Sequence, residues 1–220
     1  MRQEFKKVFC GILPGISLRL LAYKNLIQFE GSYLHQVGWL RSLKEGRPCD
    51  ARGNPIPWMN YSIVSLLESR LNASLTIFEY GSGYSTLFYA AHTGKVVSIE
   101  YDETWHKIIS THAPENTTIR LISKDVDGGY CRSILSEDKN FDIVVVDGRD
   151  RVNCIKQSLS RLTSRGVIIL DDSSRPKYAE AFEVVKDQGF RCLRLSGLKP
   201  SGRSMHESTI FYKDSNCLAI

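Results

Sequence analysis

Residues 75–86 read Leu-Thr-Ile-Phe-Glu-Tyr-Gly-Ser-Gly-Tyr-Ser-Thr, and this stretch decides the fold. Its first four residues are apolar or β-branched, which is typical of a buried parallel strand. Residues 81–83 predict a turn that is almost free of side chains, and helical spacing resumes at Tyr84. A strand, a glycine turn and a helix N-terminus together present backbone N–H groups to a ligand. We therefore expect a ligand-binding turn here, where the Glu79 carboxylate accepts hydrogen bonds from a ligand amine or hydroxyl.

Strands and helices alternate through the rest of the chain. Helical segments separate the further strands expected at residues 95–100, 118–125, 141–147, 166–170, 190–195 and 207–212. Such alternation implies a parallel sheet with helices on both faces. An α/β architecture is therefore predicted, with the last strand antiparallel to its neighbours.

The glycine turn does not match a dinucleotide site or a Walker site. Thr86 stands where the dinucleotide pattern G-x-G-x-x-G/A requires a third small residue, and no G-K-[S/T] follows the turn. Glu79-x-Gly81-x-Gly83 instead resembles the first motif, E/D-x-G-x-G, of class I S-adenosylmethionine-dependent methyltransferases. The resemblance extends over about residues 74–213. It implies a Rossmann-like, seven-stranded, mostly parallel sheet that binds S-adenosylmethionine.

The same resemblance implies a set of cofactor contacts. Glu100 ends the second strand, where a carboxylate can accept hydrogen bonds from both ribose hydroxyls, although a NAD site would place one there as well. Tyr101 is expected against the adenine. Asp125 is expected near the adenine amino group, and a solvated loop carboxylate fits its pattern equally. The full expected set is Glu79, Tyr80, Gly81, Ser82, Gly83, Ser85, Thr86, Glu100, Tyr101, Asp125 and Asp147.

Three carboxylates, those of Asp147, Asp171 and Asp172, follow neighbouring strands at the predicted carboxyl edge of the sheet. Hard oxygen ligands on a rigid edge suit Mg²⁺ or another divalent cation. In catechol-type and some sugar O-methyltransferases the matching positions bind such a cation, which lowers the pKa of a substrate hydroxyl and orients it. The alternative is that Arg149 or Arg175 neutralises the cluster and Asp172 caps the next helix, which leaves no metal.

Three side chains are candidates for the catalytic base: Asp147 itself, Asp150 three residues later, and His206 just before the expected last strand. Asp150 lies between two arginines and fits a solvated loop residue equally. The fourth strand ends in Asp147-Gly-Arg-Asp150 rather than the D/N-P-P-Y/F of base-directed amino methyltransferases. The resemblance therefore favours O-methylation of a small-molecule or sugar-type hydroxyl. The alternatives are a NAD-linked oxidoreductase and an inactive, methyltransferase-like binding protein.

Residues 1–60 do not join the strand–helix alternation. They are predicted to form an N-terminal helical cap, and residues 61–220 the S-adenosylmethionine-binding methyltransferase domain. Helical spacing marks residues 18–27 and 33–40 of the cap. Residues 57–61, just before the first motif, resemble a bacterial-type subgroup of uncharacterised methyltransferases. That resemblance implies a cap that covers the cofactor and shapes the acceptor pocket.

Composition bounds location and partners. The chain has 220 residues and six cysteines without CxxC spacing, so a cytoplasmic protein with one core and reduced thiols is expected. The apolar run over residues 8–21 is broken by Pro14 and Arg19 and is too short for a transmembrane segment. The net charge of +5 lies mostly in residues 1–50. It is too dispersed for nucleic acid. A solvated helical face is the default interpretation, and attraction of an anionic acceptor or an acidic membrane surface is the alternative. Homo-oligomerisation is left open.

Overall fold

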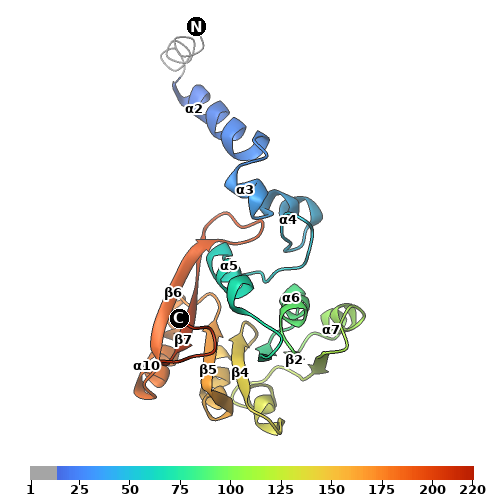
Figure 1. Ribbon diagram of the computed structural model, residues 1–220, viewed down its shortest axis with the longest axis vertical. Coiled ribbons are helices and arrows are strands. Elements are labelled where there is room, and N and C mark those ends of the chain that lie inside the picture. Colours follow the sequence, from blue (N-terminus) through green and yellow to red (C-terminus); the bar gives the residue numbers. More distant parts are fainter. Residues whose placement is uncertain (1–13) are drawn as a thin grey trace.

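The computed structural model describes residues 14–220 (Figure 1). A seven-stranded sheet runs through the domain in the order β3-β2-β1-β4-β5-β7-β6. The first five strands pair in parallel, whereas β7 is antiparallel to both β5 and β6. This arrangement confirms the predicted Rossmann-like, mostly parallel sheet. The strands are β1 (Thr76–Tyr80), β2 (Lys95–Glu100), β3 (Thr117–Leu121), β4 (Phe141–Val146), β5 (Leu162–Leu170), β6 (Arg191–Leu198) and β7 (Met205–Tyr212).

The described helices include several short ones at the N-terminal end. The α-helices are α2 (Pro14–Tyr23), α3 (Tyr33–Gln36), α4 (Trp39–Glu45), α5 (Tyr61–Arg70), α6 (Tyr84–His92), α7 (Glu103–Ser110), α8 (Gly129–Arg132), α9 (Arg151–Ser158) and α10 (Ala179–Asp187). A π-helical turn, η1 (Lys24–Gln28), continues α2. The 3₁₀ turns are η2 (Ser133–Ser136), η3 (Leu159–Arg161) and η4 (Pro176–Tyr178). No helix among residues 14–220 has the length and apolar character needed to cross a membrane.

Two hydrophobic cores lie on opposite faces of the sheet, because successive strand residues point to opposite sides. Ile77 and Ile143 pack against α5 and α6 in the first core. Phe78 and Val144, one residue later in each strand, pack against α9 and α10 in the second. All four side chains are completely buried. The sheet is thus covered by helices on both faces, as its continuous apolar strands require.

The strand register aligns the residues that follow β1, β4 and β5. Tyr80 pairs with Val146, and Val146 pairs with Leu170, at the carboxyl ends of these strands. The strand order reverses between β1 and β4. From β1 the chain adds β2 and β3 on one side of the sheet, and from β4 it adds β5 on the other side. In open α/β sheets ligands bind in the crevice outside the carboxyl ends at this point. The register therefore places Gly81, Asp147 and Asp171 side by side at one edge.

The N-terminal segment consists of a projecting part and an attached part. Helix α2 extends away from the domain, whereas α3 and α4 lie beside the loop that joins β6 to β7 (Figure 1). The Trp39 indole donates a hydrogen bond to the Gly202 carbonyl (2.9 Å), and the Trp58 indole donates to Pro200 (3.0 Å). The helix expected over residues 33–40 is split at Gly38, whose φ of +80° starts α4 in a new direction.

One part of the predicted cap, helix α2, points away from the domain and covers none of it (Figure 1). Residues 1–13 of that predicted cap lie outside the described residues.

Candidate functional site

The turn after β1 leaves a crevice because two glycines meet there. A side chain on Gly81, whose φ is +98°, would place its Cβ 2.9 Å from the Gly148 Cα. A Cβ on Gly148 would lie 2.0 Å from the Tyr130 hydroxyl oxygen and 3.0 Å from the Tyr80 backbone. At Gly83, by contrast, a Cβ would meet nothing closer than 3.7 Å. The first two glycines are required by packing, and the third leaves open space beside Trp105.

Glu79 is completely buried and holds the turn in shape rather than facing a ligand. Its carboxylate accepts hydrogen bonds from the hydroxyls of Ser85 (2.5 Å), Thr86 (2.5 Å) and Ser98 (2.7 Å). Burial raises the pKa of Glu79 to about 7, although the three hydroxyls oppose that shift. The expectation that Glu79 accepts hydrogen bonds from a ligand is not met in this geometry, because hydroxyls of the chain surround it.

Glu100, at the end of β2, lies against the turn. One of its carboxylate oxygens accepts from the Ser82 N–H (3.0 Å), and the other accepts from the Tyr101 and Asp102 N–H groups (2.8 and 2.9 Å). The Gly83 N–H donates to the Thr86 hydroxyl (2.9 Å). Two N–H groups of the glycine turn are thus already bonded to side chains of the chain itself.

A cavity of about 520 Å³, the first cavity, opens at this turn. Its size lies within the usual range for sites that bind small molecules and cofactors. It is lined by residues 81–85, 100–102 and 147–149, together with Pro48, Trp58, Trp105 and Arg151. Seven of the expected cofactor contacts therefore meet here: Gly81, Ser82, Gly83, Ser85, Glu100, Tyr101 and Asp147.

The other expected contacts lie elsewhere. The Tyr80 side chain is completely buried in the second core, and its hydroxyl donates to the Cys131 carbonyl (2.7 Å). Thr86 is buried behind the turn with Glu79. The Asp125 carboxylate accepts from the Gly129 N–H (2.6 Å) at the start of α8 and borders a neighbouring cavity. Side-chain alternation in β1 sends Tyr80 to the face of the sheet that packs against α9 and α10, which explains its position.

Aromatic and cationic side chains form one wall of the first cavity. The Arg149 guanidinium donates to the Tyr101 hydroxyl (2.8 Å) and lies 5.0 Å from the centre of its ring. The Trp105 indole donates to the Ser82 carbonyl (2.7 Å), which fixes its ring beside the turn. These contacts give the cavity a flat aromatic surface next to Glu100, which suits a purine ring.

A second cavity, of about 420 Å³, adjoins the first. Asp147 and Trp58 line both cavities. The other residues around the second cavity are mostly charged or polar: Asp171, Asp172, Arg175, Lys199, Pro200, Ser201, Gly202 and His206. Asp147 thus stands at the junction of the two cavities.

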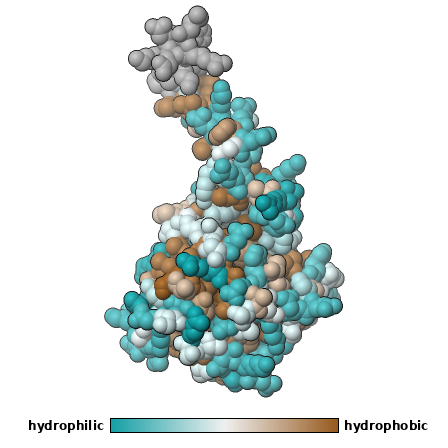
Figure 2. Space-filling model, in the orientation of Figure 1, coloured by the Kyte–Doolittle hydropathy of each residue, from teal (hydrophilic) through white to brown (hydrophobic). Residues whose placement is uncertain are grey.

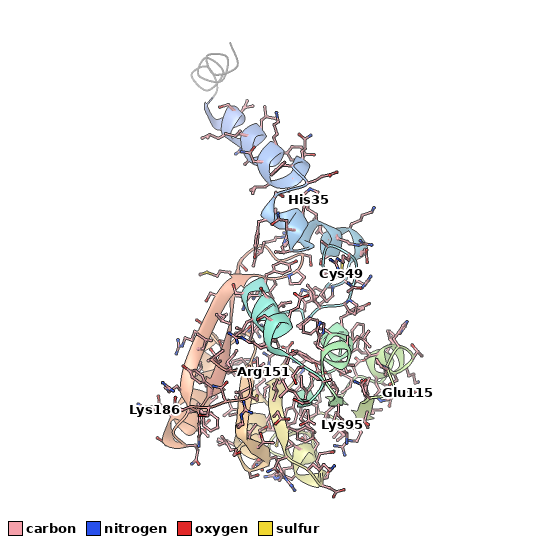
Figure 3. All side chains as sticks on the ribbon, in the orientation of Figure 1. His35, Cys49, Lys95, Glu115, Arg151 and Lys186 are labelled. Carbon is pink, nitrogen blue, oxygen red and sulfur yellow. The ribbon has the colours of Figure 1, made fainter. Side chains whose placement is uncertain are left out.

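The three carboxylates at the sheet edge are neutralised by cationic side chains. Lys199 donates hydrogen bonds to Asp171 (2.8 Å) and to Asp172 (2.8 Å), and its side chain is 12% exposed. Arg151 donates to the Asp147 carboxylate (2.7 Å) and to the Asp171 backbone carbonyl (2.5 Å). Figure 3 shows Arg151 in the interior of the domain. Arg175 forms an ion pair with Asp172.

This donor set does not fit the predicted divalent cation. The Lys199 ammonium takes one oxygen each from Asp171 and Asp172, and the Ser208 hydroxyl donates to the other oxygen of Asp171 (2.6 Å). Within the described part of the chain, residues 14–220, no group of three or more His, Cys, Asp or Glu side chains is arranged to hold a metal ion. The alternative was that a cationic side chain of the protein neutralises the carboxylates, and this alternative fits the geometry.

The details of that alternative differ from the expectation in two respects. The positive charge that neutralises the three carboxylates comes from Lys199 and Arg151 as well as from Arg175. Arg149 takes no part, because it packs on Tyr101. Asp172 does not cap the following turn, since η4 begins at Pro176 with no side-chain cap.

Two of these carboxyl groups have pKa values shifted in opposite directions. Burial and the charge of Asp171 raise the pKa of Asp147 to about 7, against the opposing effect of Arg151. Burial alone would raise the pKa of Asp172 as well, but hydrogen bonds and charge from Lys199, with His206, lower it below its usual value. Asp172 is therefore an ionised acceptor, while Asp147 can take up a proton near neutral pH.

The candidate bases are not equally placed. His206 lies within β7 rather than before it, and its Nδ1 atom is 3.2 Å from the Asp172 carboxylate at the wall of the second cavity. Asp150 begins α9 with a φ of +47°, and its carboxylate accepts from the Asp127 N–H (2.8 Å) and from the Asn153 side chain. Asp150 borders neither cavity, so the loop interpretation fits it better.

Lys199 and Arg151 are the site residues that sequence reasoning missed. Lys199 lies in a Gly/Pro/Ser-rich loop 27 residues after Asp172, and no spacing rule relates the two positions. Arg151 has a weak local signal, because an arginine four residues after Asp147 can reach back across the short loop between β4 and α9.

Known proteins resemble this chain in structure rather than in sequence. A scan against protein-family models finds no match, and a search of curated proteins finds none either. A putative O-methyltransferase from Klebsiella pneumoniae superposes with a TM-score of 0.53 at 17% identity, over 84% of this chain and 91% of that one.

Two further structures give similar values. The precorrin-6y C5,15-methyltransferase from Geobacter metallireducens gives a TM-score of 0.52 at 17% identity, over 69% of this chain and 87% of that one. The O-methyltransferase TomG from Streptomyces achromogenes, in complex with S-adenosylmethionine, also gives 0.52 at 17%, over 67% and 76%. The chain thus has the fold of class I S-adenosylmethionine-dependent methyltransferases.

Proposed function

We propose that this protein is an S-adenosylmethionine-dependent methyltransferase that acts on a hydroxyl oxygen of a small polar molecule. The observation that carries this proposal is the junction of the two cavities at Asp147, at the point where the strand order reverses. In this fold the first cavity suits the cofactor, and the second lies within reach of its reactive end. Solved methyltransferases of the same fold support the assignment.

The glycine turn of the first cavity disfavours a dinucleotide. Three carboxylates, those of Glu100, Asp102 and Asp147, line the cavity beside Arg149 and Arg151. The side chains of Glu100 and Thr86 accept hydrogen bonds from two N–H groups of the turn. A pyrophosphate needs such N–H groups free. The ammonium and sulfonium of S-adenosylmethionine are instead attracted by carboxylates. This argument weighs against the NAD-linked alternative.

The second cavity suits a hydroxylated acceptor. Its wall carries charged groups of both signs, with Lys199, Arg175 and His206 facing three aspartates. Polar hydroxyls can exchange hydrogen bonds with such a wall, and the half-exposed Trp58 ring offers a flat surface to a sugar or aromatic ring. The acceptor class proposed here is therefore a sugar-like or phenolic hydroxyl compound.

His206 is proposed as the base, oriented by Asp172. Because the Asp172 carboxylate accepts, Nδ1 of His206 is the donor and Nε2 is the acceptor nitrogen. The Ser204 hydroxyl lies 3.4 Å from Nε2, and an acceptor hydroxyl would take its place there. S-adenosylmethionine supplies a methyl group activated by its positive sulfur. As the acceptor oxygen bonds to that carbon and the carbon–sulfur bond breaks, the hydroxyl proton passes to Nε2. Asp147, whose pKa is raised, is the alternative acceptor for that proton.

A divalent cation has no part in this proposal. Lys199 occupies the position between Asp171 and Asp172 that a cation would need. Its ammonium keeps the carboxylates compensated and holds Asp172 in place beside His206. Lys199 is thus a positioning residue.

Calorimetry on the full chain tests the cofactor assignment. S-adenosylhomocysteine is expected to bind in the micromolar range, roughly −8 kcal/mol, and NAD is expected not to bind. Glu100→Ala should weaken binding at least about tenfold, since a desolvated carboxylate that faces the ribose is lost. Glu103→Ala, an exposed residue on α7 outside the cavity wall, is the matched control and should leave affinity unchanged. Tight NAD binding without heat from S-adenosylhomocysteine would overturn the proposal.

A further inference from the structure

Helix α2 and the following turn expose an unusual number of large apolar side chains. Seven of them are between 41% and 62% exposed: Ile16, Leu18, Leu20, Leu21, Tyr23, Leu26 and Phe29. Figure 2 shows such side chains along the part of the molecule that projects from the domain. Contiguous apolar exposure of this kind marks a surface that binds something.

The apolar side chains of α2 do not form one stripe. At about 100° per residue, Leu20 and Tyr23 point within roughly 40° of Ile16, whereas Leu18 and Leu21 point to the opposite half of the helix. A second protein chain packed on one face would leave the other half exposed to water. A fluid lipid surface can instead surround apolar side chains on more than one side of a helix.

The charge around this helix has one sign. Within residues 14–29 the charged side chains are Arg19 and Lys24, and there is no Asp or Glu. Counted over residues 1–29, the sequence has five Lys or Arg and one acidic residue, Glu4. Basic side chains near a bilayer are attracted by the negative surface potential of anionic lipids. The charge is therefore complementary to an anionic membrane surface.

The cations of this segment fit a position in the interface. Arg19 and Lys24 lie among the apolar side chains of residues 14–29. Such a helix can bury its apolar side chains at the boundary between head groups and acyl chains while its cations stay at the phosphates.

We propose that residues 14–29 dock the protein on the surface of an anionic lipid bilayer, with the leucines of α2 among the acyl chains and Arg19 and Lys24 at the head groups. Helix α2 and the loop between β6 and β7 lie toward the same end of the molecule (Figure 1). Trp39 and Trp58 bind that loop. The same loop lines part of the second cavity.

Vesicle co-sedimentation with the full chain tests this proposal and needs no catalytic activity. The protein should bind phosphatidylcholine vesicles that contain about 30% phosphatidylserine at least about tenfold more tightly than pure phosphatidylcholine vesicles. Leu18→Glu with Leu21→Glu should lower binding about tenfold or more, because charges replace inserted side chains. Arg19→Glu with Lys24→Glu should abolish the preference for the anionic lipid.

Leu43→Glu is the matched control, because Leu43 is 55% exposed on α4 but lies outside the projecting helix. This variant should bind vesicles like the unchanged chain. The proposal is wrong if the unchanged chain does not bind anionic vesicles, or if the Leu18/Leu21 double variant binds them equally well. A concentration-dependent dimer that the double variant loses, without any vesicle binding, would assign the helix to a second copy of the chain instead. Cofactor affinity does not enter this test, so it can fail independently of the proposed function.

Discussion

Glu79 near the end of β1 and Asp172 at the edge after β5 are both buried carboxylates, but they are stabilised in different ways. Neutral hydroxyls surround Glu79, and burial raises its pKa to about 7. Asp172 is buried too, yet the charge and hydrogen bonds of Lys199 lower its pKa. Hydroxyls position a carboxylate without compensating its charge, whereas a cation does both. The first arrangement shapes a turn, and the second keeps an ionised group beside His206.

The largest effect is expected from Lys199→Met. Removing this cation leaves Asp171 without its ion-pair partner and Asp172 with Arg175, so the free energy of unfolding should fall by about 3–5 kcal/mol in urea titrations. The same variant should gain thermal stability from Mn²⁺, since the carboxylate oxygens become available to a hard cation. Lys156→Met is the control, because Lys156 pairs with Glu180 at the surface and should cost about 1 kcal/mol or less.

A Lys199→Met protein as stable as the unchanged chain would show that the cation does not compensate these carboxylates. Stability that is equally insensitive to Mn²⁺ in both proteins would argue against the latent cation site.

The next effect concerns Glu79 and pH. Because its pKa is raised from 4.5 to about 7 in the folded protein, the folded state keeps a proton that the unfolded state loses between these pH values. Its contribution to stability is fully present below pH 4.5 and is lost as the pH rises through 7. This contribution to the free energy of unfolding is about 3 kcal/mol, since one pKa unit corresponds to about 1.4 kcal/mol.

Glu79→Gln should therefore flatten the decline of the free energy of unfolding between pH 5 and pH 8, measured by urea titration at each pH. Asp147 shifts in the same direction, so some decline remains in the variant. Glu103→Gln, which is exposed on α7, should keep the full slope. An unchanged slope in Glu79→Gln would mean that Glu79 is ionised throughout and that its hydroxyl partners suffice.

Two glycine variants distinguish a glycine that the packing of the turn requires from one that leaves room for a ligand. Gly148→Ala puts a Cβ against the Tyr130 hydroxyl and the Tyr80 backbone, and overpacking of this kind should cost about 1–3 kcal/mol. Gly83→Ala makes only ordinary van der Waals contacts, at 3.7 Å or more, and its φ of 177° suits any residue, so its stability should be unchanged while S-adenosylhomocysteine affinity falls. Thermal unfolding and calorimetry distinguish the two. Equal stability of both variants would contradict the packing described here.

The smallest effect is expected from Trp58→Phe. This change removes the hydrogen bond to Pro200 but keeps most of the ring, so about 1 kcal/mol of stability should be lost. Hydrogen exchange in the loop after β6 should become faster, because one of its two indole contacts is gone. His92→Phe, on α6 and away from this loop, should leave that exchange unchanged. No change in either variant would mean that Trp39 alone holds the loop.

Much of the fold follows from local pattern. The apolar strand before Gly81 and the helical spacing after Gly83 predicted the β1–α6 unit, and the same alternation predicted the parallel sheet. Such elements can be predicted from a single sequence, because their geometry depends mainly on residues that are close together in the chain. The direction of a single side chain was harder to predict. Tyr80 was expected at the cofactor, but the pleat of β1 turns it into the core.

By itself, the sequence determined that Gly81, Glu100, Asp147 and Asp171 would end strands at one edge, because parallel strands in this topology share their carboxyl ends. It also predicted that these residues bind a ligand. Only the tertiary structure decided what lies between the carboxylates. Lys199 comes from a loop far along the chain that Trp39 and Trp58 hold in place. A contact of this kind depends on how the loop closes in three dimensions, so no sequence periodicity predicts it.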